Sequence, residues 1–248
     1  MSGSLLEKEI GILGSGVWGT IGPHSVRAAD MLSGVVGSRY GLLCHSRDAA
    51  YEAVLRHFGA FRGAKTAVGT ICEPSDALVA SYTGSDIVFL DDPSEADGVA
   101  CAVIGVTRDF DGFPLDEISQ RCRSRSIPLI LSAAGYIRTK WRGQSLLGYA
   151  DAAVYSLEKG SEIYAGKGGF IATNDLEVYS GAFAWHNCGR AFGEGASLNI
   201  EGIIGGDFRV SEWTAAVVES VIESGSYGEA ADPERREMSK EPVYSRIG

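Results

Sequence analysis

Residues 152–173 read AAVYSLEKGSEIYAGKGGFIAT and hold two short apolar runs on either side of a glycine-rich connection. The runs, Ala152–Ser156 and Gly169–Thr173, consist of small, aliphatic and aromatic residues, a composition that suits short strands buried on both faces. We therefore predict two central strands of a sheet in this stretch.

Four segments elsewhere in the chain have the same character. They are Tyr40–Cys44, Asp86–Leu90, Val99–Val106 and Pro128–Leu131. Helical patterns fall between and after them, at Asp48–Phe58, Glu73–Tyr82, Pro114–Arg125, Leu176–Asn187 and Ser211–Glu223. Alternating strands and helices are typical of a mostly parallel sheet covered by helices. The sequence thus predicts an α/β fold in three layers.

The bulk composition favours one large globular domain. The chain has 248 residues, is 45% hydrophobic and carries a net charge of −10, so phosphate backbones and anionic membrane surfaces would repel it. No run of apolar residues is long enough to span a bilayer and no signal peptide is visible, so we expect a cytoplasmic protein. Residues 1–226 are predicted to form the domain, and residues 227–248, which are charged and poor in apolar side chains, a disordered tail.

Two motifs suggest nucleotide binding and fail on closer reading. Ile10–Thr20 contains G-x-G-x-x-G, but Gly22-Pro23 would break the following helix and no acidic residue closes a second strand. Gly160–Gly168 resembles a P-loop with the wrong spacing and no Ser or Thr for magnesium. The five cysteines are odd in number and scattered, so we expect reduced thiols, and no metal-binding pattern is present.

Five segments, in the right order and at the right intervals, resemble the DegT/DnrJ/StrS family of sugar aminotransferases. They are Ser46–Gly59, Gly112–Ile118, Pro128–Ala134, Tyr155–Asp175 and Gly205–Glu212. The resemblance implies the large domain of a fold-type-I PLP-dependent transferase, which in the family continues into a C-terminal domain that we expect this chain to lack. It also implies an active site at a dimer interface.

The matched positions, however, lack the groups that PLP chemistry requires. An enzyme of this kind uses a lysine for the Schiff base and a carboxylate for the pyridinium nitrogen. The resemblance places Ser161 at the lysine and Ser132 at the carboxylate, and only Ser156 keeps its family identity, as a phosphate-contact serine. Other matched positions hold Arg47-Asp48 at the phosphate, Glu73 at the stacking aromatic and Asp207 at the interfacial asparagine. We therefore predict no cofactor and no aminotransferase activity.

The same correspondence predicts a remodelled pocket. Its residues are His45, Asp48, Cys72, Glu73, Ser132, Ser156, Glu158, Ser161 and Asp207. We expect a non-catalytic or regulatory partner, as a homodimer or as a heterodimer with an active paralogue, in natural-product or sugar biosynthesis. Three alternatives stay open. The first is a cofactor-independent enzyme for isomerisation, cyclisation or dehydration, with Glu73 and His45 as acid–base candidates. The second is a module that binds a small molecule without turnover, and the third is PLP binding through another lysine. In the plainest interpretation, the polar residues only fill a vacated cavity with water.

Overall fold

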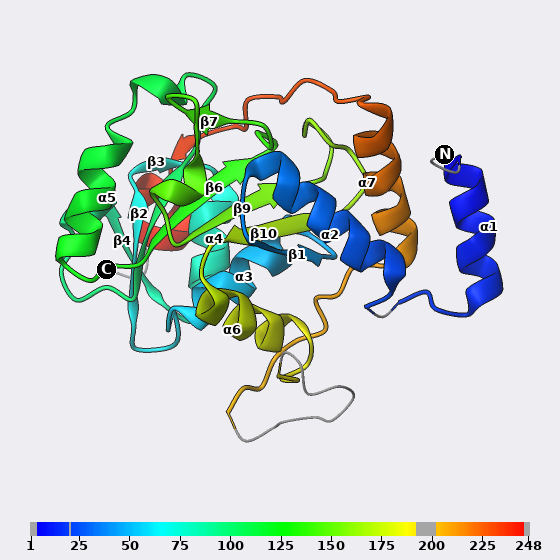
Figure 1. Cartoon of the computed structure of the whole chain (residues 1–248). Helices are drawn as coiled ribbons and strands as arrows, with labels where there is room; N and C mark the ends of the chain where they lie inside the picture. Colours follow the sequence, from blue (N-terminus) through cyan, green and yellow to red (C-terminus); the bar gives the residue numbers. More distant parts are fainter. Residues whose placement is uncertain (1–3, 20, 192–201, 246–248) are drawn as a thin grey trace.

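A seven-stranded sheet forms the centre of the protein in the computed structural model, which describes residues 4–19, 21–191 and 202–245 (Figure 1). In spatial order the strands are β1 (Tyr40–Cys44), β10 (Gly169–Thr173), β9 (Ala152–Ser156), β6 (Leu129–Ala134), β5 (Cys101–Gly105), β2 (Lys65–Gly69) and β4 (Asp86–Leu90). The five strands from β9 to β4 are parallel, and β10 alone runs against its neighbours. The predicted mostly parallel sheet is confirmed.

Helices cover both faces of this sheet and complete the three layers. The described residues form the helices α1 (Leu5–Ser15), α2 (Pro23–Val36), α3 (Arg47–His57), α4 (Pro74–Tyr82), α5 (Leu115–Ser124), α6 (Leu176–His186), α7 (Glu212–Ser224) and the short α8 (Pro242–Ser245). Helix α1 does not cover the sheet and packs against α7 (Figure 1). Buried residues of α2, α5 and α7 share one core cluster, and those of α3, α4 and α6 share the other. Serine or aspartate side chains cap α3, α6 and α7 at their first turns, which satisfies amide groups that a helix leaves unpaired.

Three of the main elements of the domain were not predicted from the sequence. Strand β2 was missed, as were the helices α1 and α2. The glycine-rich stretch that resembles a dinucleotide motif is not a strand and turn: Ile10 lies inside α1, Gly16 ends that helix in a left-handed conformation, and Pro23 begins α2. A proline in the first turn of a helix is well tolerated, so Gly22-Pro23 starts a helix instead of breaking one.

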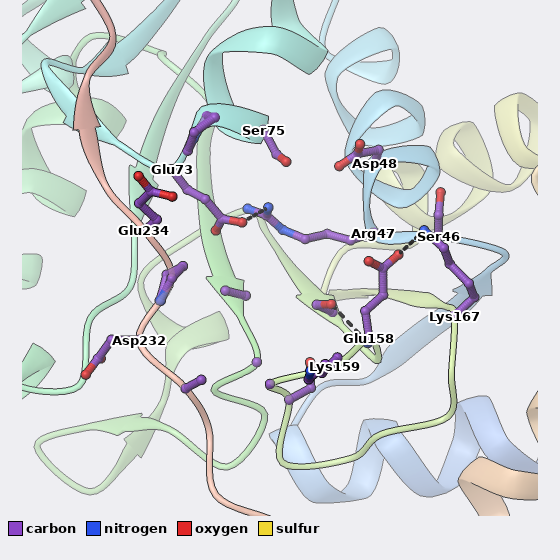
Figure 2. A pocket seen from close by; sticks show the side chains of 18 residues that line it. Ser46, Arg47, Asp48, Glu73, Ser75, Glu158, Lys159, Lys167, Asp232 and Glu234 are labelled. Atoms are coloured by element: carbon purple, nitrogen blue, oxygen red, sulfur yellow. Dashed lines mark hydrogen bonds and ion pairs between the residues drawn. The ribbon is translucent and has the colours of Figure 1, made fainter.

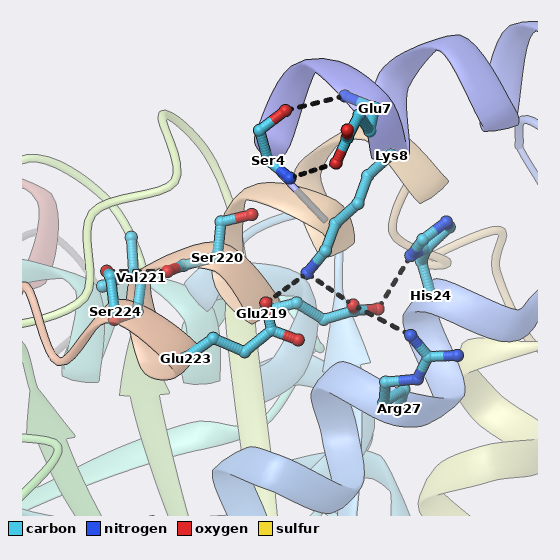
Figure 3. Close-up of polar contacts among 10 residues, drawn as sticks. All are labelled: Ser4, Glu7, Lys8, His24, Arg27, Glu219, Ser220, Val221, Glu223 and Ser224. Atoms are coloured by element: carbon cyan, nitrogen blue, oxygen red, sulfur yellow. Dashed lines mark hydrogen bonds and ion pairs between the residues drawn. The ribbon is translucent and has the colours of Figure 1, made fainter. Parts of the chain in front are cut away.

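Helix α1 is held to the domain through a buried ion cluster (Figure 3). The carboxylate of Glu219, on α7, is 0% exposed and contacts Lys8 Nζ at 2.9 Å, His24 Nδ1 at 2.8 Å and Arg27 at 3.4 Å. Lys8 also contacts Glu223 at 2.8 Å. A buried carboxylate must be paired to remain charged, so this cluster links α1, α2 and α7 at one point.

Most of the stretch for which the sequence predicts a disordered tail makes specific contacts with the domain. Residues 227–245, called the C-terminal segment below, cross the edge of the sheet from α7 and are ordered by specific contacts (Figure 1). Strand β11 (Arg236–Glu237) pairs antiparallel with β3 (Ile71–Cys72), and Met238 is 3% exposed. A few apolar residues are enough to hold this segment in place, because they pack against a domain that is already folded and need not form a core of their own. Residues 246–248 lie outside the described residues.

Candidate functional site

A polar pocket of about 500 Å³ lies where the parallel strands end (Figure 2). Strand β6 ends at Ala134 and β9 at Ser156, and the chain turns from β1 into α3 at Ser46. The carboxyl edge of a parallel sheet is the usual place for a ligand in such folds, because loops diverge there. The lining residues are Ser46, Arg47, Asp48, Glu73, Pro74, Ser75, Ala134, Gly135, Ser156, Glu158, Lys159, Gly160, Ser161, Lys167, Ala231, Asp232, Pro233 and Glu234.

The guanidinium of Arg47 occupies the floor of this pocket. Its side chain is 6% exposed and donates to Glu73 at 2.6 Å, to Asp76 at 2.7 Å and to Ser132 Oγ at 2.5 Å. Ser132 Oγ in turn donates to Asp76 at 2.6 Å. One cation and two carboxylates are therefore closed into a network with a serine, and Asp76 and Ser132 are almost entirely buried within it.

Burial and neighbouring charges shift the pKa values of this network in opposite directions. Burial alone would lower the pKa of Arg47, but the carboxylates of Asp76 and Glu73 raise it above its usual value, so the guanidinium stays charged. Burial raises the pKa of Glu73, and the cations Arg47 and Arg235 only partly offset this. Burial therefore favours the protonated form of the Glu73 carboxyl group relative to a solvent-exposed one.

The opposite wall of the pocket comes from the connection between β9 and β10. Ser156 Oγ accepts from the amide of Glu158 at 3.1 Å, and the Glu158 carboxylate contacts Lys167 Nζ at 3.2 Å. Lys159 and Ser161 lie on the same loop. Gly169 allows the loop to return closely past α3, because a side chain there would collide with the carbonyl of Ser46. The hydroxyls and both lysine amines therefore surround the pocket on this side.

The C-terminal segment forms the third wall. Figure 2 shows Asp232 and Glu234 on this segment, across the pocket from Asp48 and Lys167. Asp232 accepts from Arg108 Nε at 3.2 Å and also from the Tyr136 hydroxyl. Burial is the main cause that raises the pKa of Tyr136 to about 12. The phenol therefore stays protonated and can donate to Asp232.

The structure brings together five of the nine residues predicted for the pocket. Asp48, Glu73, Ser156, Glu158 and Ser161 line it.

The other four predicted residues lie elsewhere. Ser132 is behind the floor, covered by Arg47. Cys72 is buried in a core cluster, where burial raises its thiol pKa to about 12. His45 packs against the ring of Phe208. Asp207 pairs with Arg209 at 2.7 Å, and this pairing holds its pKa below the usual value. His45 and Glu73 therefore do not form an acid–base pair.

Several pocket residues were not among the predicted site residues. They are Arg47, Lys159, Lys167, Asp232 and Glu234, with Asp76 behind them. A signal existed for Arg47, which follows directly after a strand and opens a helix at the edge where parallel sheets bind ligands. No signal existed for Asp232 and Glu234, because they belong to the stretch predicted to be disordered.

Within the residues that the structure describes, no group of three or more His, Cys, Asp and Glu side chains is arranged to hold a metal ion. No helix in the described ranges has the length and apolarity to cross a membrane.

The fold of this chain is shared with aminotransferases of known structure. The chain is similar to 3-amino-5-hydroxybenzoic acid synthase (TM-score 0.77, 21% identity, 88% of this chain and 60% of that chain). It is also similar to PseC of Helicobacter pylori, an aminotransferase of pseudaminic acid biosynthesis (TM-score 0.76, 19% identity, 90% and 63%).

Residues 5–224 match the DegT/DnrJ/EryC1/StrS aminotransferase family, and the chain belongs to it. A curated relative is 3-amino-5-hydroxybenzoate synthase of Amycolatopsis mediterranei, 24% identical over 225 residues, or 85% of this chain and 58% of the relative. The chain spans about half the length of the curated relatives it matches. The family resemblance predicted from the five sequence segments is thereby confirmed.

Proposed function

We propose that this chain is a PLP-independent member of its family and acts as a non-catalytic or regulatory partner of an active homologue in natural-product or sugar biosynthesis. The observation that carries the proposal is the buried network of Arg47, Asp76, Glu73 and Ser132 in the floor of the pocket. The family resemblance places Ser132 at the carboxylate partner of the ring nitrogen, Glu73 at the stacking aromatic and Arg47 at the phosphate.

The residues present do not fit PLP. A ring nitrogen could reach Ser132 only by displacing Arg47, and removing that guanidinium would strand the carboxylate of Asp76 in the protein interior. Ser132 offers a hydroxyl where a charge is needed to hold a protonated ring nitrogen. At the position of the covalent lysine, Ser161 is 6% exposed and has no amine.

Two lysines nevertheless face the pocket, and they make the proposal testable. Lys159 and Lys167 lie on the same loop as Ser161, and Lys167 is held by Glu158 near the protein surface. We expect the purified protein, mixed with excess PLP, to show no absorption band of a bound imine beyond that of free PLP with exposed lysines. After borohydride reduction and peptide mapping, Lys159 and Lys167 should be labelled no more than Lys140, an exposed lysine outside the pocket. Stoichiometric label on either pocket lysine would overturn PLP independence.

The partner role has its own test. The family resemblance implies that members assemble as dimers. A chain that keeps the domain but lacks the catalytic groups can therefore pair with a catalytically active member. Co-expression with a catalytic family member of the source organism should give a 1:1 complex by size-exclusion chromatography with light scattering. The complex should change the aminotransferase rate of that enzyme several-fold. A stable homodimer with no effect on the enzyme rate argues against the partner role and leaves PLP independence to the labelling experiment.

The alternative of a cofactor-independent acid–base enzyme draws on Glu73 alone. Glu73 faces the pocket and its pKa is raised mainly by burial, as a proton donor requires. The partner predicted for it, His45, lies outside the lining residues. We therefore place this second function behind the partner role.

A further inference from the structure

The C-terminal segment closes one side of the pocket and is attached at its two ends in different ways. Ala231, Asp232, Pro233 and Glu234 line the pocket between those ends. The segment is therefore the one wall of the pocket that lies outside the sheet and the loops that join its strands. A movement of this wall would change access to the pocket without disturbing the sheet.

The first end is attached through the main chain. The amides of Gly228 and Ala231 donate to the carbonyls of Glu162 and Gly160, each at 2.8 Å. Arg108 donates to the carbonyl of Ala230 at 2.8 Å, and Ala230 itself is buried. The two main-chain contacts are made to the loop between β9 and β10, which already lines the pocket, so this end is attached to that wall.

The second end depends mainly on side chains. Strand β11 has two residues, both exposed, and its next residue Met238 is the buried contact that fixes it in the core cluster containing Cys72. Arg235 donates to the carbonyl of Val106 at 2.7 Å, at a place where only glycine at position 105 leaves room for the guanidinium. Beyond these, Tyr244 packs on Phe89. An element with few buried contacts opens at a lower free energy than the core does.

We propose that the C-terminal segment is a hinged closure of the pocket, fixed at residues 228–231 and released at Arg235 and β11 with Met238 to admit a ligand. In the closed position it carries Arg235 toward Glu73, whose carboxylate this cation stabilises. Opening would remove that cation as well as the wall. Closure of the pocket by this segment does not depend on PLP chemistry, so the two proposals are tested independently.

The test measures access with a thiol reporter inside the pocket. S161C places a thiol at a buried lining position, and its alkylation by iodoacetamide is followed by peptide mass mapping, which separates it from the native cysteines. Ile71 and Glu237 lie directly opposite in the antiparallel pair, at a spacing that suits a disulfide. I71C/E237C in the S161C background, oxidised, therefore locks the second end, and I71S/E237S is the matched unlocked control.

We expect the locked protein to react at position 161 at least 10-fold more slowly than the unlocked control. M238A in the S161C background should react about 5-fold faster than S161C alone, because the buried contact of the second end is removed. Equal rates in the locked and unlocked proteins would overturn the closure. An alkylation rate at position 161 that M238A leaves unchanged would also overturn the closure. This result is sufficient by itself if the disulfide does not form.

Discussion

Replacing Arg47 with alanine is expected to destabilise the protein by about 4 kcal/mol, because removal of one partner from a buried ion pair leaves the other charge uncompensated. Asp76 is 1% exposed and, among the described residues, would keep the Ser132 hydroxyl as its one side-chain donor. Glu73 is less affected, since its side chain is 21% exposed and can turn toward water. Urea unfolding at pH 7 measures the change as a shift of the midpoint at constant slope.

Arg56 provides a matched control on the same helix. It pairs with Glu52 at 2.7 Å one turn away and lies over the ring of Trp185, both near the surface. Surface pairs of this kind contribute on the order of 0.5 kcal/mol, so R56A should cost about 1 kcal/mol or less. If R47A cost no more than R56A, the network would not be the element that fixes the pocket floor.

A double variant separates the ion pair from simple packing. Replacing a whole buried pair by apolar residues of similar volume is often close to neutral. R47M/D76L should therefore recover more than half of the stability that R47M loses alone. A double variant less stable than R47M would mean that the floor needs the hydrogen bonds to Ser132 and not only a filled volume.

The strands were the most predictable part of the fold, for a physical reason. Segments such as Ala152–Ser156 are buried on both faces, so their composition alone marks them. Strand β2 was missed because Lys65–Gly69 begins with lysine and ends with glycine, and its burial comes from β4 and β5 on either side. Pairing with its two neighbours stabilises β2 as a strand, and the local sequence does not reveal this pairing.

The site was predictable in place but not in its internal contacts. Chain order and the family resemblance put Glu73, Ser156 and Ser161 at one edge, and the structure places them there. His45 and Ser46 are neighbours at the end of β1, yet only Ser46 lines the pocket, because successive side chains of an extended chain point to opposite sides. The pairing of Arg47 with Asp76 spans 29 residues, and only the packing of α3 against α4 creates it.

Acidification should destabilise the protein through His186, a residue that the pocket does not use. Its side chain is 1% exposed on α6, and its Nδ1 has no hydrogen-bond partner among the described residues. Burial lowers its pKa to about 4, against about 6.5 for an exposed histidine. Between pH 6.5 and pH 4, His186 binds a proton in the unfolded chain but not in the folded protein. The stability of the fold therefore falls as the pH falls from about 6.5 to about 4.

The expected loss of stability is about 3 kcal/mol. Carboxylates titrate in the same pH range, so the loss is measured as the difference between wild type and a variant without His186. H186Q keeps a polar side chain but has no proton to gain. Urea unfolding of both proteins at pH 7, 5.5 and 4 should show the stability of wild type falling toward that of H186Q, so that the gap between them closes by about 3 kcal/mol. A gap between wild type and H186Q that stays constant with pH would mean that His186 binds a proton in the folded protein as readily as in the unfolded chain, so that burial does not lower its pKa.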